Sequence, residues 1–177
     1  MARMGRFGRE SFNNMANMDK LAALVNSFGS AVLSVGREVG LSVALNKAKV
    51  SQGIKVENAC AAALIGIVGN GARARVLIML DMDGFNSIVT AMSGGMIPPN
   101  LNDAVSQSVI AELSNMVGGR ALLQASLTGM DVTPPQMIVG DNIKHIPNPA
   151  ATMKSFTLPF IIQPAGALYL ALSFGNA

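Results

Sequence analysis

Apolar residues recur every three or four positions along two stretches of the chain, as they do in helices that bury one face. The first helix is expected between Asp19, which can cap its N-terminus, and Gly40, which can end it. The second is expected over residues 102–127. The buried side of the first comprises Leu21, Leu24, Val25, Phe28, Val32, Val35 and Val39.

The second stretch predicts the longest helix of the chain, capped by Asn102 or Asp103 and ended by Gly129. A shorter helix is expected over residues 82–92, before a break at two consecutive prolines. The apolar side expected for the long helix consists of Val105, Val109, Ile110, Leu113, Val117, Ala121 and Leu122.

Shorter apolar runs have the length of strands. Two of them, at about residues 59–68 and 74–81, flank a Gly-Asn-Gly turn and predict a hairpin. Three more follow the long helix, over residues 137–139, 155–162 and 167–174. Helices placed between runs of strands predict an α+β fold, a mixed and largely antiparallel sheet with helices packed on it.

The predicted elements divide the chain into two parts. Residues 1–17 are polar and weakly periodic, and they bury too little apolar area to offset the entropy of ordering, so we expect a mobile leader. Residues 18–177 are expected to form one domain, since domains of this length are common.

Composition and charge exclude several classes of protein. Half of the 177 residues are hydrophobic, only 13% are charged, and Asn70, Arg73 and Arg75 interrupt the most apolar stretch, so we expect no membrane insertion. The chain has a net charge of +3, which comes largely from the leader, and it has no Trp, so it lacks the basic stripe and aromatic platforms typical of nucleic-acid binding. The N-terminus has no apolar secretory segment, and the expected location is the cytoplasm.

Several patterns associated with chemistry have a structural explanation. Residues 69–74 match the dinucleotide pattern G-x-G-x-x-A, but a strand rather than a helix is expected to follow, which favours a hairpin turn. One cysteine, Cys60, and one histidine, His145, cannot build a metal site with scattered carboxylates. A Ser–His–Asp arrangement stays open, although no serine lies in a nucleophile elbow.

The long helix carries a less ordinary pattern on the side away from its apolar residues. At 100° per residue, Ser108, Glu112, Asn115 and Gly119 fall within about 60° of one another. Gly118 and Gly119 inside a helix each cost about 1 kcal/mol relative to Ala, which indicates the close approach of another backbone or a partner. An ordinary polar face with a glycine kink is the alternative.

These residues carry a resemblance to a known family. Ser108-x-x-x-Glu112-x-x-Asn115, then Met116-Val117-Gly118-Gly119 and Asp131-Val132-Thr133-Pro134-Pro135, resembles the signature of the CheC/CheX/FliY phosphatases of the response regulator CheY. Residues 91–96 also resemble the segment before the catalytic helix of that family. The spacing from Asn115 to Pro134 and Pro135 is slightly shorter than is usual in the family.

The resemblance implies a function and a set of site residues. Asn115 would position the water that attacks an aspartyl phosphate, and Glu112 would bind a lysine of the phosphorylated CheY-like receiver domain. Ser108, Gly118, Gly119, Pro134 and Pro135 would contribute to docking. No cofactor of its own is implied, because the Mg²⁺ belongs to the receiver.

The number of motif copies points within the family to CheX. A second Glu-x-x-Asn is absent from the first helix as predicted from Asp19, where Ala23 precedes Asn26 by three residues, although Glu10 and Asn13 repeat the spacing in the leader. One copy in a short chain resembles CheX and implies a homodimer joined through a sheet edge. The alternative is a non-catalytic module of the same fold that binds receivers or joins a flagellar-switch assembly.

Overall fold

The residues described by the computed structural model, 5–69, 72–126, 129–143 and 154–176, form three α-helices and an eight-stranded sheet. In chain order the elements are α1 (Gly5–Glu38), β1 (Ser42–Leu45), the short 3-10 helix η1 (Lys47–Lys49), β2 (Ser51–Gln52), β3 (Ala61–Gly69), β4 (Ala72–Leu80), α2 (Met82–Met92), α3 (Ala104–Gln124), β5 (Asp131–Val132), β6 (Gln136–Val139), β7 (Lys154–Gln163) and β8 (Ala167–Asn176).

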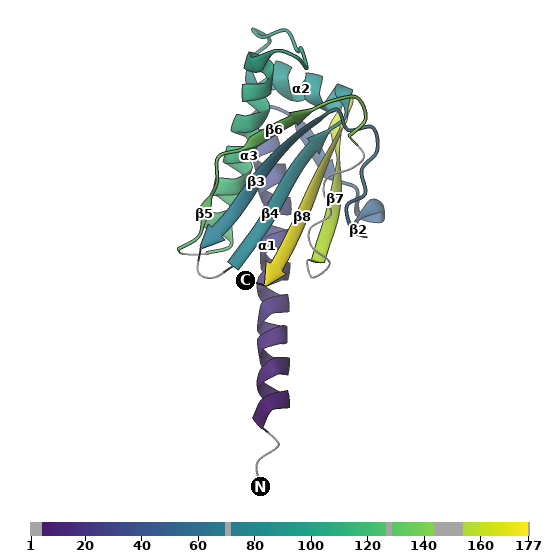
Figure 1. Ribbon diagram of the computed structural model, residues 1–177. Coiled ribbons are helices and arrows are strands. Elements are labelled where there is room, and N and C mark those ends of the chain that lie inside the picture. The colour runs from purple at the N-terminus through teal and green to yellow at the C-terminus, as the bar shows by residue number, and fades with distance from the viewer. Residues whose placement is uncertain (1–4, 70–71, 127–128, 144–153, 177) are drawn as a thin grey trace.

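The sheet has the strand order β1-β7-β8-β4-β3-β5, with β2 beside β7 and β6 beside β3. Each of these neighbouring pairs is antiparallel. Figure 1 shows the three helices on one face of this sheet, with α3 running alongside β5 and β6. The predicted α+β fold is confirmed, and no described strand pair is parallel.

The main core lies between the helices and the sheet. Alternate residues of the four long strands point toward the helices, as the period of a strand requires. From the helices, Phe28 of α1, Phe85 of α2 and Ile110 of α3 are fully buried against them. The strand residues of this core are Ala61, Ala63, Ile65, Ile67, Ala74, Val76, Ile78, Leu80, Leu158, Phe160, Ile162, Leu168, Leu170 and Leu172.

The hairpin predicted around the Gly-Asn-Gly turn is confirmed. Strands β3 and β4 pair from Ala61 opposite Leu80 to Gly69 opposite Ala72. Because β4 follows the pattern at Ala72, the pattern does not open a helix, as dinucleotide binding requires. The Ser–His–Asp possibility depends on His145, which lies outside the described residues.

Helix α1 differs from the prediction at its N-terminus. It ends at Glu38, followed by Gly40 with φ +82°, as expected, but it begins at Gly5 rather than after Asp19. Periodicity did not indicate the first turns, since a helix that extends beyond the sheet needs no buried stripe there. Figure 1 shows this part projecting away from the domain. The mobility of residues 1–17 stays a prediction.

Helix α3 confirms the helix predicted over residues 102–127, with shorter bounds, but it is not the longest of the chain, because α1 has 34 residues and α3 has 21. Asp103 caps it by accepting a hydrogen bond from the Ser106 amide at 3.1 Å. Its end comes at Gln124, because Ser126 rather than Gly129 is the first residue after it to adopt a left-handed conformation, at φ +52°. None of the described helices is long and apolar enough to cross a membrane.

Candidate functional site

The outward face of α3 carries the polar stripe that the sequence predicts. Ser108, Glu112 and Asn115 are all exposed, and a Cβ added to Gly119 would meet no atom within 4 Å. Helix geometry places Glu112 and Asn115 about one turn apart on the same side. The structure therefore brings these four residues together on one open surface.

The side chains of Glu112 and Asn115, at the centre of this stripe, are free to bind a partner molecule. Among the described residues, neither the Glu112 carboxylate nor the Asn115 amide has a hydrogen-bond or ion-pair partner. The Ser108 hydroxyl instead donates to the Val105 carbonyl at 2.7 Å. Ser108 can therefore accept a hydrogen bond from a partner, whereas donating one would break this local contact.

Gly118 lies about 100° around α3 from Gly119, on the side that meets the sheet, and does not share the open face. It is buried, and a Cβ there would come within 3.0 Å of Ile65 Cδ1 and 3.2 Å of both Val132 methyl groups. The residue lets the helix pack closely on β3 and β5. The expected docking role of Gly118 therefore requires correction, because its neighbours are the sheet of its own chain.

Pro134 and Pro135 lie on the sheet edge next to α3, between β5 and β6. Thr133 joins them to β3: its amide donates to the Gly66 carbonyl at 2.9 Å, and its Oγ1 accepts from the Gly66 amide at 2.8 Å. Proline has no N–H, so it is tolerated at an edge, where it interrupts the ladder. Pro134 is exposed and Pro135 is half-buried. The prolines therefore lie on the sheet edge beside α3 and not on the helix that carries Asn115.

The C-terminal half of α3 is tied to α1 by one arginine. Arg120 forms an ion pair with Glu38 at 2.6 Å and donates a hydrogen bond from Nη1 to Ser34 Oγ at 2.9 Å. Both charged side chains remain partly exposed, so the pair contributes little to stability, on the order of 1 kcal/mol or less. Its consequence for the site is that Arg120 is held by α1, which leaves Glu112 as the unpaired charge of α3.

Two apolar residues lie exposed on the outward face: one contradicts the sequence prediction, and the other was not assigned by it. Val105, which was placed on the apolar side, is 52% exposed, and Leu123 is 82% exposed. Their spacing from Glu112, 7 and 11 residues, turns both of them to within about 20° of it at 100° per residue. On a helical wheel, Val105 and Leu123 therefore align with Glu112 and not with the buried residues of α3.

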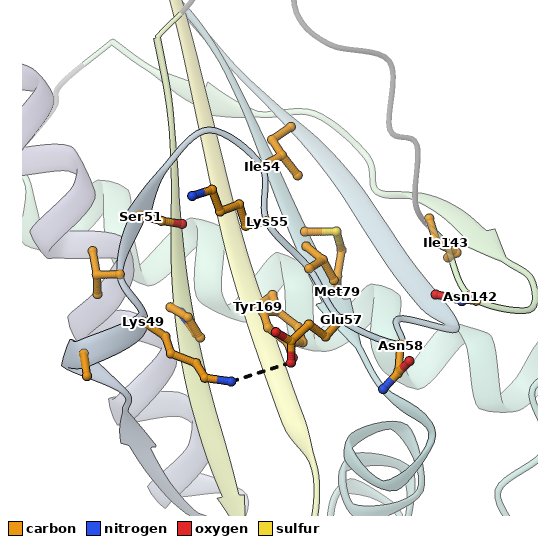
Figure 2. Close-up of a pocket in the computed structure, with 14 residues that line it drawn as sticks. Lys49, Ser51, Ile54, Lys55, Glu57, Asn58, Met79, Asn142, Ile143 and Tyr169 are labelled. Carbon is orange, nitrogen blue, oxygen red and sulfur yellow. Dashed lines mark ion pairs between the residues drawn. The ribbon is translucent and has the colours of Figure 1, made fainter.

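A cavity of about 880 Å³ lies on the other face of the sheet and offers a different kind of surface (Figure 2). Lys49 and Glu57 form an ion pair across it at 3.6 Å, over Met79 and Tyr169. Burial, with Glu57 and Asp81 nearby, raises the pKa of Tyr169, which keeps its hydroxyl neutral. The cavity thus holds an ion pair, the side chain of Lys55 and an un-ionised phenol.

A reactive thiol and a metal site are the other kinds of chemistry to consider, and the described residues support neither. Burial and the neighbouring Asp81 raise the pKa of the Cys60 thiol, so it carries little of the reactive thiolate at neutral pH. In the described parts of the chain, no three histidine, cysteine, aspartate or glutamate side chains lie close enough to hold a metal ion. The unpaired acid and amide of α3 are therefore the strongest candidate site.

Comparison with protein families assigns the chain. The sequence model described as "Chemotaxis phosphatase CheX" matches residues 61–160, which include α2, α3, the strands β3 to β6 and most of β7. The chain belongs to the CheX family. Among curated proteins, no relative matches it.

Solved structures show that the CheX fold extends over nearly the whole chain. A CheC-like superfamily protein from Shewanella sp. PV-4 is similar with a TM-score of 0.72 and 22% identity, covering 87% of this chain and 98% of that one. CheX from Vibrio vulnificus has a TM-score of 0.70 and 23% identity, with coverage of 85% and 98%. A CheX–CheY–BeF3–Mg²⁺ complex from Borrelia burgdorferi has a TM-score of 0.65 and 17% identity, with coverage of 86% and 97%.

Proposed function

We propose that this CheX-family protein hydrolyses the aspartyl phosphate of a CheY-like response regulator, with α3 as the helix that enters the phosphorylated site. The observation that carries the proposal is the pair of exposed, unpartnered side chains, Glu112 and Asn115, one turn apart on a helix packed against the sheet. Family membership and the similar CheX–CheY complex support a receiver as the partner.

The reaction needs a positioned water more than a strong base. The water oxygen attacks phosphorus in line, the bond from phosphorus to the aspartate carboxylate oxygen breaks, and inorganic phosphate and free aspartate form. Phosphoryl transfer depends mainly on positioning and on stabilisation of charge. The Asn115 amide oxygen accepts a hydrogen bond from this water, which turns a water lone pair toward phosphorus, and its NH₂ group can donate to water or phosphoryl oxygen.

Glu112 has a separate role in the proposal. Its carboxylate binds the lysine of the receiver, and the resulting ion pair orients α3 over the phosphoaspartate. The Mg²⁺ comes with the receiver as part of the substrate, so this chain has no cofactor of its own to supply. An interfacial ion pair that is desolvated on docking fixes orientation and contributes to affinity.

Gly119 allows the receiver to come close to α3. It follows Asn115 by four residues on the same face, and the absence of a side chain there lets the receiver backbone come close. Ser108, at the other end of the stripe, accepts a hydrogen bond, and the edge at Pro134 and Pro135 flanks the docked domain.

The test is the release of inorganic phosphate from a panel of phosphorylated receivers of the same organism, with wild type and two matched variants. Asn115→Ala should reduce the accelerated rate by about 10²–10³-fold, the usual effect of losing one preorganised transition-state contact. Asn26→Ala is the control, because Asn26 is also an exposed helical asparagine but has Ala23 where a glutamate would stand. It should leave the rate unchanged.

Either of two outcomes would contradict the proposal. If no receiver loses phosphate faster with the wild-type protein, or if Asn115→Ala and Asn26→Ala are equally active, α3 is not the hydrolytic site. Tight binding of a phosphorylated receiver without hydrolysis would make the protein a binding module of the same fold.

A further inference from the structure

The outward face of α3 is unusually poor in charge for a helix surface in contact with water. Between Ala104 and Gln124 the only ionisable residues are Glu112 and Arg120, and Arg120 is held by Glu38 of α1. Val105 and Leu123 stand exposed on the same stripe as Glu112, at 52% and 82%. A solvated helix face normally carries several charges and few large apolar groups, so this one is suited to contact with another protein.

We infer that Val105 and Leu123 are the two apolar contacts of the docked receiver, one on each side of its phosphorylated site. The inference rests on the proposed function and adds the recognition chemistry of the partner. The receiver must present apolar surface on both sides of its lysine and phosphoaspartate, spaced to meet these two side chains.

The spacing of the residues supports a single partner that covers all of them. Val105 and Leu123 are 18 residues apart, which is about 27 Å along a helix at 1.5 Å per residue. A standard interface buries about 800 Å² on each partner, a patch roughly 30 Å across. The midpoint between them lies at Ser114, directly between Glu112 and Asn115 in the sequence, so a domain centred on that pair reaches both ends.

The negative charge of Glu112 favours a receiver over a second copy of this chain as the partner that covers this stripe. A symmetric dimer across the same stripe would bring Glu112 of one copy close to Glu112 of the other, and like charges at short range repel. A receiver instead offers a lysine to the carboxylate. One unpaired charge with apolar residues at either end therefore fits a partner with a central cation and an apolar rim.

The experiment measures binding to a stably phosphorylated receiver and, separately, the single-turnover hydrolysis rate at saturating phosphatase. The variants are Leu123→Gln and Val105→Gln, since glutamine keeps a high helix propensity. Val50→Gln is the control: Val50 is 45% exposed but lies between η1 and β2, at the sheet edge away from α3. Figure 1 shows β2 and α3 at opposite sides of the molecule.

We expect Leu123→Gln to weaken receiver binding by about tenfold or more and Val105→Gln by about threefold, with the rate at saturation within twofold of wild type. Val50→Gln should bind as wild type does. Unchanged affinity in both α3 variants would overturn the inference, as would a homodimer that Leu123→Gln converts to monomer, since the stripe would then be a self-contact. Absence of hydrolysis by the wild type would count against the proposed function instead, and the binding comparison would still test the docking contacts.

Discussion

At the scale of single residues, the adjacent glycines of α3 have different surroundings. A methyl group at Gly118 would press on Ile65 and on both methyl groups of Val132, whereas one at Gly119 would enter open space. Sequence reasoning treated the pair alike, because both are helical glycines beside the same motif. Their roles separate only when the sheet is in place behind the helix: one allows packing, and the other leaves the outward face open.

The two glycines give a paired stability prediction. Gly119→Ala should raise the free energy of unfolding by about 0.5–1 kcal/mol, the difference in helix propensity, while slowing dephosphorylation by obstructing the receiver. Gly118→Ala should be less stable than Gly119→Ala, because the same gain is offset by crowding against the sheet. Urea denaturation of both variants measures this order, and a more stable Gly118→Ala would contradict it.

At the scale of elements, the sheet edge beside α3 depends on one threonine. Thr133 pairs with Gly66 through both its backbone amide and its side-chain oxygen, between two short strands and just before Pro134 and Pro135. The side-chain oxygen accepts a hydrogen bond from the Gly66 amide of β3. This contact holds the edge in register where the prolines interrupt the ladder.

Thr133→Val should therefore lower the free energy of unfolding by about 1–2 kcal/mol, because the Gly66 amide loses its acceptor. Thr133→Ser keeps the oxygen and should lose less. Chemical denaturation, with hydrogen exchange of the Gly66 amide as a local readout, makes the comparison. Equal stability of Thr133→Val and wild type would show that the side-chain bond does not hold this edge.

The elements that the sequence predicted are those with a repeating apolar pattern. Helices α2 and α3, the β3–β4 hairpin and the strands β6, β7 and β8 were expected close to their observed bounds, whereas α1 was expected only from Asp19 onward. Strands β1, β2 and β5 were not expected, because segments of two to four residues at a sheet edge are too short to show alternation. The first turns of α1 were not predicted for a different reason: they do not cover the sheet, so they need no repeating apolar stripe.

The candidate site was predicted more completely than the edges of the fold. Ser108, Glu112, Asn115 and Gly119 share one open face, as their spacing required. Gly118 was misplaced, and Val105 was assigned to the buried side. The role of Gly118 was taken from the family resemblance, which does not separate the two adjacent glycines. Val105 was assigned by the spacing of apolar residues along the chain, although it lies within about 20° of Glu112 around the helix.

At the scale of the whole molecule, both edges of the sheet end in short strands. One edge carries β1 and β2 on β7, and the other carries β5 and β6 on β3. Short, interrupted strands limit pairing with unrelated chains. The edge of β1 and β2 is the one away from α3, so pairing there leaves the outward face of the helix open to a receiver.

A symmetric homodimer through a sheet edge stays a prediction of the family resemblance. Light scattering at tens of micromolar should give about twice the chain mass of 18.3 kDa. The receiver-binding variants Leu123→Gln and Val105→Gln should retain this mass. A monomer at that concentration would contradict the predicted dimer and leave the assignment of α3 unaffected.

The central claim is that Asn115 acts on the attacking water while Glu112 acts on the docked receiver. The most direct measurement is the single-turnover dephosphorylation rate at saturating phosphatase, taken together with the affinity for a stably phosphorylated receiver. For Asn115→Ala, we predict a rate about 10²–10³-fold lower with affinity within threefold of wild type, because a contact made mainly in the transition state changes the rate and not the binding. For Glu112→Ala, we predict that affinity falls as well. Equal losses of rate and affinity in Asn115→Ala would contradict the account and leave α3 as a docking face alone.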